Sequence, residues 1–171
     1  MKPFPNILLV AGSGRNVGKT SVVERLIHGF KDHGIIALKV SPHFHALRGD
    51  EKLIRKTDGY TISEEINPDS TKDSSRFLRA GAQKVFFIQA LGKNLKEAFI
   101  RTFDLLPENA AVIVESGGLR DFIQPSLFIY VKGKQNDNKP ADYSSKADLI
   151  TNLNDFNTNR IIWTGKEWKR R

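Results

Sequence analysis

A glycine-rich turn near the N-terminus has the residue types that a phosphate-binding loop requires. The apolar residues 7–11 are followed by Gly12-Ser13-Gly14-Arg15-Asn16-Val17-Gly18-Lys19-Thr20. Glycines let the backbone bend tightly and direct several N–H groups at one anion, while a lysine can reach the β and γ phosphates and a hydroxyl can bind Mg²⁺. This order of strand, turn, lysine and hydroxyl is typical of a P-loop, and it predicts a nucleoside triphosphate site. A glycine-rich turn that binds nothing is the alternative.

The contacts to the triphosphate are expected from the turn and from the start of the helix that follows it. The N-terminus of a helix carries partial positive charge, which favours a phosphate group there. The residues that we expect to bind are Gly14, Arg15, Asn16, Val17, Gly18, Lys19, Thr20 and Ser21. Ser13 stands where the pattern G-x-x-x-x-G-K-[ST] has its first glycine, so the loop is expected to be one residue longer or to have a different shape.

The segments around the turn alternate between strand and helix. Apolar residues between 22 and 30 recur at helical spacing, and Gly34 suits a left-handed helix end. A second strand at 35–40 follows after a short linker, which indicates a βαβ unit with parallel strands. Further strands are expected at 84–88, 110–115 and 127–131, and further helices at 71–82 and 91–106. We therefore expect an α/β chain with the three-layer P-loop NTPase fold and a mostly parallel central sheet.

Two segments interrupt this alternation. Asp58-Gly59 separates two strand-like runs, residues 53–56 and 60–63, which predicts a β-hairpin after the second strand. Residues 132–145 are polar and are expected to form a mobile loop before a small C-terminal extension, residues 146–171, which ends in a hairpin. All of these elements fit one nucleotide-binding domain spanning residues 1–171.

Composition limits the classes of protein to which the chain can belong. It has 171 residues and no cysteine, which excludes disulfides and thiolate metal sites. Its apolar runs are too short for a transmembrane helix and its start lacks the pattern of a signal peptide, so we expect a soluble cytoplasmic protein without membrane contacts. The formal net charge of +8 suits anionic partners. The basic residues around Trp168 are expected to form a solvated tail, with a nucleic-acid-binding stripe as the alternative.

Glu115 ends the apolar strand 110–115, at a position where P-loop proteins place an acidic residue beside Mg²⁺. We expect Thr20 and Glu115 to hold the metal, and Lys19 and Glu115 are the candidate catalytic residues. In the alternative interpretation, Glu115 orders residues 116–118 or caps a neighbouring element, and Asp121 is the nearest other acidic candidate.

Two further pairs of residues have the types that bind anions or metals. His43 and His45 lie just beyond the second strand, and on an extended backbone both imidazoles face one side. Phosphate or substrate contact, a metal site and ordinary loop histidines are the alternatives. Asp73 and Arg76 lie in the first turns of the helix predicted over 71–82, where they can face a bound anion or the metal shell. Polar residues are also common at helix starts without any function.

Several of these segments together resemble the molybdopterin-guanine dinucleotide biosynthesis protein B family of P-loop proteins. The resemblance covers roughly residues 6–131. It is carried by Asn16-Val17-Gly18-Lys19-Thr20, by Lys39 followed by His43 and His45, and by Lys72-Asp73-Ser74-Ser75-Arg76 with Arg79-Ala80-Gly81-Ala82. The resemblance implies a GTP-binding protein with feeble hydrolysis, commonly dimeric, that assists the enzyme attaching a nucleotide to molybdopterin. It also favours a binding role for Lys39, His43, His45, Asp73 and Arg76.

Three functions follow from these observations. The first is a GTP-binding accessory protein of molybdenum cofactor synthesis, a homodimer with weak Mg²⁺-dependent hydrolysis and the nucleotide-attaching enzyme as partner. The second is an ATP-dependent phosphotransferase or ligase for a small acidic metabolite, which Lys39, His43 and His45 would bind. Nucleic-acid binding rests on charge alone. The guanine-reading pattern N-K-x-D is absent, since Asn138-Lys139-Pro140-Ala141-Asp142 has its acid one residue late, so GTP is implied by the resemblance and ATP stays possible.

Overall fold

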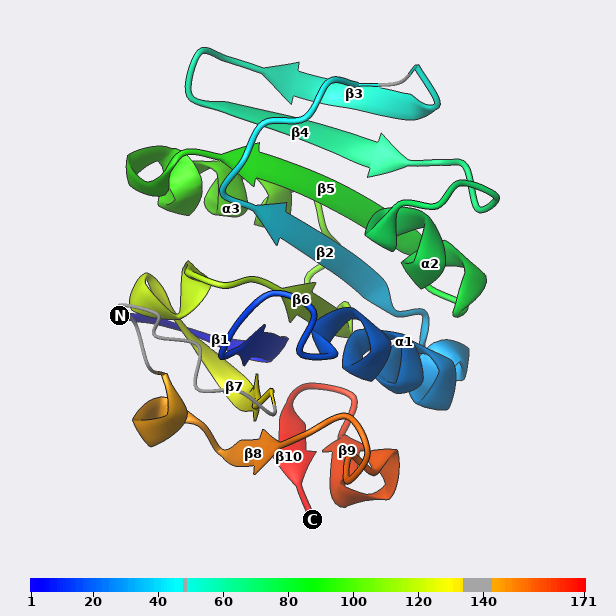
Figure 1. Ribbon diagram of the computed structural model, residues 1–171, viewed down its shortest axis with the longest axis vertical. Helices are drawn as coiled ribbons and strands as arrows, with labels where there is room; N and C mark the ends of the chain where they lie inside the picture. Colours follow the sequence, from blue (N-terminus) through cyan, green and yellow to red (C-terminus); the bar gives the residue numbers. More distant parts are fainter. Residues whose placement is uncertain (48, 134–142) are drawn as a thin grey trace.

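The computed structural model describes residues 1–47, 49–133 and 143–171, which form an eight-stranded sheet with helices on its two faces (Figure 1). The strands are β1 (Lys2–Gly12), β2 (Ile36–Ser41), β3 (Glu51–Lys56), β4 (Tyr60–Glu65), β5 (Lys84–Ala90), β6 (Val112–Glu115), β7 (Ile123–Val131) and β8 (Leu149–Thr151). Their order in the sheet is β3-β4-β5-β2-β6-β1-β7-β8. From β5 to β8 every pairing is parallel, and β3 and β4 add two antiparallel pairings at one edge. The predicted α/β fold with a mostly parallel sheet is confirmed.

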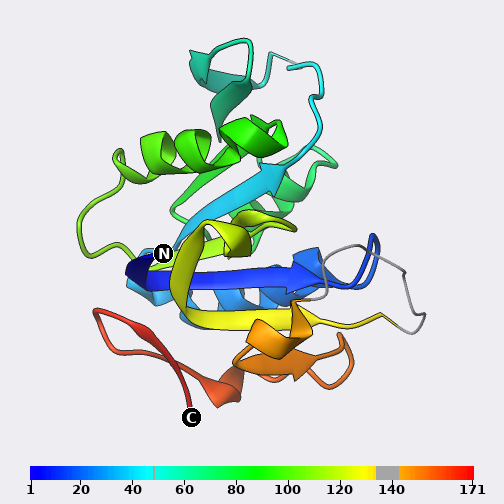
Figure 2. The same ribbon diagram turned by 90° about the vertical axis from the view of Figure 1, so that its left-hand side faces the viewer.

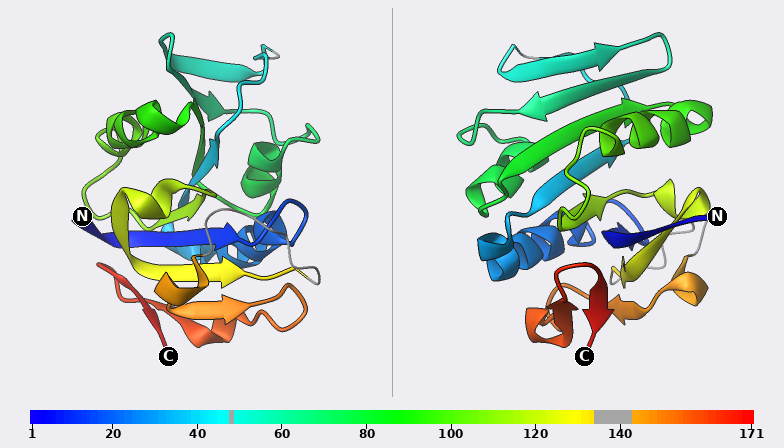
Figure 3. Two further views of the ribbon diagram at one scale, coloured as in Figure 1. Left: turned by 60° about the vertical axis from the view of Figure 1, so that its left-hand side comes forward. Right: turned by 180° about the vertical axis from the view of Figure 1, so that it is seen from behind.

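Helices cover both faces of the sheet, so the fold has three layers (Figure 2). The helices are α1 (Lys19–Phe30), α2 (Asp73–Arg79) and α3 (Leu95–Phe103). α1 and α2 pack on one face and α3 on the other (Figure 3). In β1, Leu8 belongs to the apolar core under α1 and Leu9 to the core under α3. Strands buried on both faces need apolar residues at successive positions, which explains the continuous apolar runs in the sequence.

The carboxyl ends of β1, β2 and β6 meet at one edge of the sheet. β1 and β2 run parallel as predicted, but β6 lies between them. Val10 of β1 and Lys39 of β2 both pair with Glu115 of β6. In open α/β sheets ligands bind beyond the carboxyl ends of the strands, so this register places three predicted site regions at the edge where a ligand is expected.

The predicted hairpin is present as β3 and β4. Thr57 closes its turn, since its Oγ1 accepts hydrogen bonds from the N–H groups of Gly59 and Tyr60 at 3.2 and 3.1 Å. β4 also pairs antiparallel with β5, so the hairpin extends the central sheet. β3 is therefore the last strand at this edge and is exposed along most of its length.

Two predicted helices are shorter in the structure. The helix predicted over 71–82 is reduced to α2, because Lys72 before it is extended and Gly81 after it has a left-handed φ of 105°. The helix predicted over 91–106 starts only at Leu95, after a 3₁₀ turn at Gly92–Asn94. In the described ranges no helix is long and apolar enough to cross a membrane.

The C-terminal residues are part of the fold: the basic residues around Trp168 are exposed to solvent as expected, but they belong to a hairpin and do not form a tail. β8 joins the central sheet beside β7, and β9 (Ile161–Trp163) pairs antiparallel with β10 (Trp168–Arg170) as the predicted hairpin. Trp168 is 0% exposed, and its ring centre lies 5.0 Å from that of Phe30 in α1. Burial of the indole outweighs the charge of its neighbours, whose long side chains reach solvent. Most of the predicted loop 132–145 falls on residues 134–142, outside the described ranges.

Candidate functional site

The turn between β1 and α1 is a compact loop with backbone conformations that glycine allows. Gly18 has a left-handed φ of 101° just before α1. A Cβ at Gly12 would lie 2.8 Å from the carbonyl oxygen of Val131, so a larger residue there would displace the strand. Ser13 donates from its N–H to that carbonyl oxygen at 3.0 Å, and its hydroxyl accepts from the N–H of Gly133 at 3.0 Å. The serine at the position of the first pattern glycine therefore ties the loop to the end of β7.

A cleft of about 570 Å³ opens beside this loop at the carboxyl ends of β1, β2 and β6. Lys19 Nζ donates to the carbonyl oxygen of Gly14 across the loop. The predicted site residues that line the cleft are Gly14, Arg15, Asn16, Gly18, Lys19, Thr20, Ser21, Lys39, His43, Asp73, Arg76 and Glu115. Val17 and His45 are the two predicted residues that do not line it. The side chain of Val17 lies against the backbone at Gly12 and Gly133 and helps to pack the loop.

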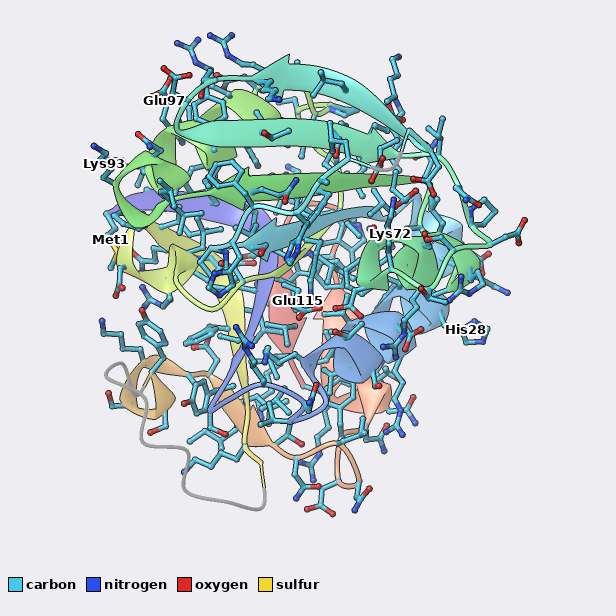
Figure 4. The ribbon with its side chains drawn as sticks, turned by 45° about the horizontal axis from the view of Figure 1, so that its top comes forward. Met1, His28, Lys72, Lys93, Glu97 and Glu115 are labelled. Carbon is cyan, nitrogen blue, oxygen red and sulfur yellow. The ribbon has the colours of Figure 1, made fainter. Side chains whose placement is uncertain are left out.

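Glu115 is the last residue of β6 and lies in the cleft, 4% exposed (Figure 4). Thr20 Oγ1 donates to its Oε2 at 3.0 Å, and Lys39 Nζ donates to its Oε1 at 2.6 Å. Because β6 lies between β1 and β2, its carboxyl end is next to both the loop and Lys39. The sheet therefore fixes this carboxylate between the start of α1 and β2.

The alternatives for Glu115 were that it orders residues 116–118 or that Asp121 is the acidic residue of the site. The hydroxyl of Ser116 accepts from the N–H groups of Gly118 and Leu119 at 3.3 and 3.1 Å, so Ser116 orders the turn after β6. Asp121 does not line the cleft and accepts instead from the Tyr143 hydroxyl at 2.5 Å. Burial and the Asp121 carboxylate raise the pKa of Tyr143 to about 12. Asp121 is thus part of a structural contact away from the loop.

Thr20 and Glu115 provide the oxygen atoms that Mg²⁺ prefers as ligands. Mg²⁺ is usually held by one or two protein oxygens, with phosphate oxygens and water completing its shell. A hydroxyl and a carboxylate 3.0 Å apart, beside a loop with the features of a phosphate site, fit that arrangement. Among the described residues no group of three or more His, Cys, Asp or Glu side chains has the geometry to hold a metal ion.

Lys39 connects Glu115 to the start of α2. Its Nζ donates to Asp73 Oδ2 at 2.8 Å. Partial burial opposes ionisation of Asp73, but the charges of Lys39 and Arg76 prevail and hold the pKa of that carboxyl below its ordinary value of 3.8. Arg76 Nε and Nη2 donate to the two carboxylate oxygens of Glu24 in α1, at 3.0 and 2.6 Å. Asp73 and Arg76 thereby connect the start of α2 to α1 and to the cleft, which polar residues at an ordinary helix start need not do.

The two histidines line different, adjoining spaces. His43 lines the cleft, and its Nε2 lies 3.2 Å from Arg15 Nη2. His45 lines a neighbouring hollow, and its backbone N–H donates to Gln89 Oε1. The extended backbone assumed for the two histidines is absent, because residues 42–46 are irregular, so the alternation of side chains in a strand does not apply to them.

Sequence reasoning missed Leu153, Ser116 and Gly117, which also line the cleft. Leu153 follows β8, and its side chain lies against Gly18, where an added Cβ would be 2.9 Å from the leucine Cβ. No local pattern predicts this contact, because it depends on β8 pairing with β7. Ser116 and Gly117 could have been predicted, because a polar residue and a glycine that directly follow an apolar strand lie at the edge of the sheet where ligands bind. The motif weighed as a guanine reader, residues 138–142, lies outside the described ranges.

Comparison with known proteins supports the fold. No family model matches the chain, and no curated protein matches it. The crystal structure of the "apo" form of LpxK from Aquifex aeolicus in complex with ATP superimposes with a TM-score of 0.57 at 18% sequence identity. The match covers 98% of this chain and 54% of the other, so the chain spans about half the length of that protein. At this identity the similarity establishes a shared P-loop fold, and function has to be argued from the site.

Proposed function

We propose that this chain binds a nucleoside triphosphate together with Mg²⁺ in the cleft at the carboxyl ends of β1, β2 and β6. The observation that carries the proposal is the contact of Thr20 Oγ1 with Glu115 Oε2 at 3.0 Å, directly after the loop that holds Lys19. A hydroxyl at the start of a helix and an acidic residue at the end of a neighbouring strand are the protein oxygens of a P-loop metal site. The fold shared with a protein solved in complex with ATP adds support.

Each side chain has a distinct role in this proposal. The N–H groups of residues 14–18 and of the start of α1 bind the phosphates, and Lys19 donates to the terminal ones. Mg²⁺ supplies positive charge that polarises the terminal phosphate when it is bound. Glu115 orients the Thr20 hydroxyl and Lys39. Lys39 offsets part of the negative charge of Glu115 and Asp73, which limits their repulsion of a triphosphate.

The finer role that we propose is a GTP-binding accessory protein of molybdenum cofactor synthesis, with weak hydrolysis and a homodimeric state. It rests on the resemblance of residues 16–20, 39–45 and 72–82 to the molybdopterin-guanine dinucleotide biosynthesis protein B family. Asp73 and Arg76, from the most distinctive of these segments, line the same cleft as the loop. The nucleotide-attaching enzyme is the partner that this role requires.

A second candidate function is an ATP-dependent phosphotransferase. The observation in its favour is a second hollow that shares Lys39, Ser41 and Asp73 with the cleft, so a second ligand could bind next to the triphosphate. An acidic metabolite suits this hollow poorly, because its lysines are already paired with carboxylates.

Calorimetric titration with GTP and ATP, each with and without Mg²⁺, tests the proposal. Charged hydrogen bonds are worth about 1.5–3 kcal/mol each, so Lys19→Ala is expected to weaken triphosphate binding at least about tenfold. Lys93→Ala, at an exposed lysine away from the cleft (Figure 4), is the matched control and should bind normally. Unchanged affinity in Lys19→Ala contradicts the assignment of the loop.

The same titrations separate the two finer roles. A preference for GTP, with hydrolysis that only a partner protein stimulates, supports the accessory role. A preference for ATP, with phosphate transfer only in the presence of an acceptor, supports the phosphotransferase.

A further inference from the structure

A second hollow of about 270 Å³ lies beside the cleft; we call it the side hollow. Lys39, Ser41 and Asp73 line both spaces, so the two are neighbours. The side hollow is lined by residues of β2 and β5, by Glu51 of β3 and by residues 45–46 and 72–74. Pockets for drug-sized ligands are somewhat larger, so this volume suits a small metabolite.

Gln89 provides a hydrogen-bond donor in the lining of the side hollow. It is 1% exposed, and its Oε1 accepts from the backbone N–H of His45. Its Nε2 donates to no other residue within the described ranges, although the side chain lines the hollow. This amide is not among the buried polar side-chain atoms that lack a hydrogen-bond partner, so solvent reaches its N–H groups from the hollow. They are therefore available to a ligand that has an acceptor atom at this point.

The lining of the side hollow also includes an aromatic ring. Phe87 of β5 pairs with Lys39 of β2, and Gln89 pairs with Ser41, so all four side chains lie on the same face of the sheet. Phe87 is half-buried and lines the hollow. A flat ring with a polar substituent could therefore stack on Phe87 and reach Gln89, which is two residues further along the same strand.

The charges around the side hollow disfavour an anion. Lys72 contacts Asp50 and Glu51 at 2.6 and 2.5 Å and Glu65 at 3.9 Å. The hydrogen bond from Lys72 is the main reason why the pKa of Asp50 falls to about 2, so this carboxylate is ionised at neutral pH.

Lys39 is likewise paired with two carboxylates, those of Asp73 and Glu115. The two ammonium groups at the side hollow thus contact more carboxylates than they can neutralise. An incoming phosphate or carboxylate would meet net negative charge instead of a free cation.

We propose that the side hollow is a second ligand site for an uncharged, metabolite-sized compound that has a flat ring for Phe87 and a carbonyl group for the Gln89 amide. The ligand would lie beside Lys39 and Asp73, next to the terminal phosphate of the nucleotide that we place in the cleft. Its binding needs no nucleotide, so the site can be tested whether or not the proposed function holds.

Nicotinamide and nicotinate are matched probes for this site, because they share one flat ring and differ in carrying a neutral amide or a carboxylate. Millimolar titrations of the isotope-labelled chain are followed by NMR without nucleotide. Nicotinamide is expected to bind saturably and to shift the amide signals of residues 39–46 and 87–89, while nicotinate binds at least about threefold more weakly. Gln89→Leu is expected to weaken nicotinamide binding about three- to tenfold, as for loss of one hydrogen bond.

Gln124→Leu is the matched control, since Gln124 is exposed on β7 and lies outside the side hollow. Gln89→Glu, which removes the donor but keeps a polar side chain, replaces Gln89→Leu if thermal unfolding finds the leucine variant unfolded. Absence of saturable nicotinamide binding, equal or tighter binding of nicotinate, or unchanged affinity in the Gln89 variant overturns the proposal. A separate titration with GTP and ATP reports on the cleft, so the two proposals can fail independently.

Discussion

Replacing Glu115 with glutamine removes one negative charge from the cleft with little change in shape. The amide keeps an oxygen that can accept from the Thr20 hydroxyl, so the main loss is the charged contact with Lys39 Nζ at 2.6 Å. A hydrogen bond between charged groups is worth about 1.5–3 kcal/mol, and solvent screens a buried contact little. We therefore expect the free energy of unfolding, measured in urea, to fall by about 1.5–3 kcal/mol.

The same substitution is expected to weaken nucleotide binding with Mg²⁺ but not without it. With Mg²⁺, loss of the anionic oxygen beside Thr20 weakens the metal site, and the affinity for the triphosphate should fall at least about tenfold, or about 1.4 kcal/mol. Without Mg²⁺, the carboxylate only repels the phosphates, so Glu115→Gln should bind free nucleotide as tightly as the unmodified chain or more tightly.

Calorimetric titration in Mg²⁺ and in chelator measures both affinities. Glu108→Gln, at an exposed glutamate, is the matched control for the loss of one charge. Equal changes in affinity under the two conditions, or no change in either, refute the metal role of Glu115. A loss of stability alone would mean that the carboxylate serves only to hold Lys39 and Thr20 in place.

Two further substitutions test contacts away from the metal site. The hydrogen bond from Lys72 is the main cause that lowers the pKa of Asp50 from 3.8 to about 2. Because the pKa is lower in the folded chain, the ionised carboxylate stabilises the fold above about pH 4. This contribution is lost as the pH falls through about 2. Thermal unfolding should therefore find a shallower loss of stability over this range in Asp50→Asn, and an unchanged slope would contradict the pairing. Trp168→Ala removes a fully buried ring whose Nε1 donates to the Asn6 carbonyl oxygen at 3.1 Å, and urea unfolding should find a loss of about 3–5 kcal/mol. Lys169→Ala, at an exposed lysine, is the control and should change the free energy of unfolding by less than about 0.5 kcal/mol. A similarly small effect of Trp168→Ala would mean that β9 and β10 do not unfold together with the core.

The neighbourhood of Thr20 and Glu115 could be predicted although 95 residues separate them. The apolar runs before each residue predict buried parallel strands, and the carboxyl ends of such strands meet at one edge of the sheet. The same argument holds for Lys39, near the end of β2, because its strand is also apolar and short. Position at the end of a strand is local information, and the rule for parallel sheets converts it into a place in space.

Other features could not be predicted because they depend on which elements become neighbours. The placement of β6 between β1 and β2, the contact of Leu153 with Gly18 and the burial of Trp168 all join segments far apart in the sequence. The prediction of an extended backbone at His43 and His45 failed for a different reason. The alternation of side chains holds in a strand, and the chain leaves the sheet at Ser41.

The sequence by itself determined the phosphate loop, the alternation of strands and helices, and the residue types that gather at one edge of the sheet. These features follow from glycine conformation, apolar periodicity and the geometry of parallel strands, which act over a few residues. Only the tertiary structure decided that Lys39 lies between Glu115 and Asp73, that Lys72 is surrounded by carboxylates, and that Gln89 faces a hollow beside the cleft. Strand order, register and the packing of distant segments create these contacts, and no short stretch of sequence carries that information.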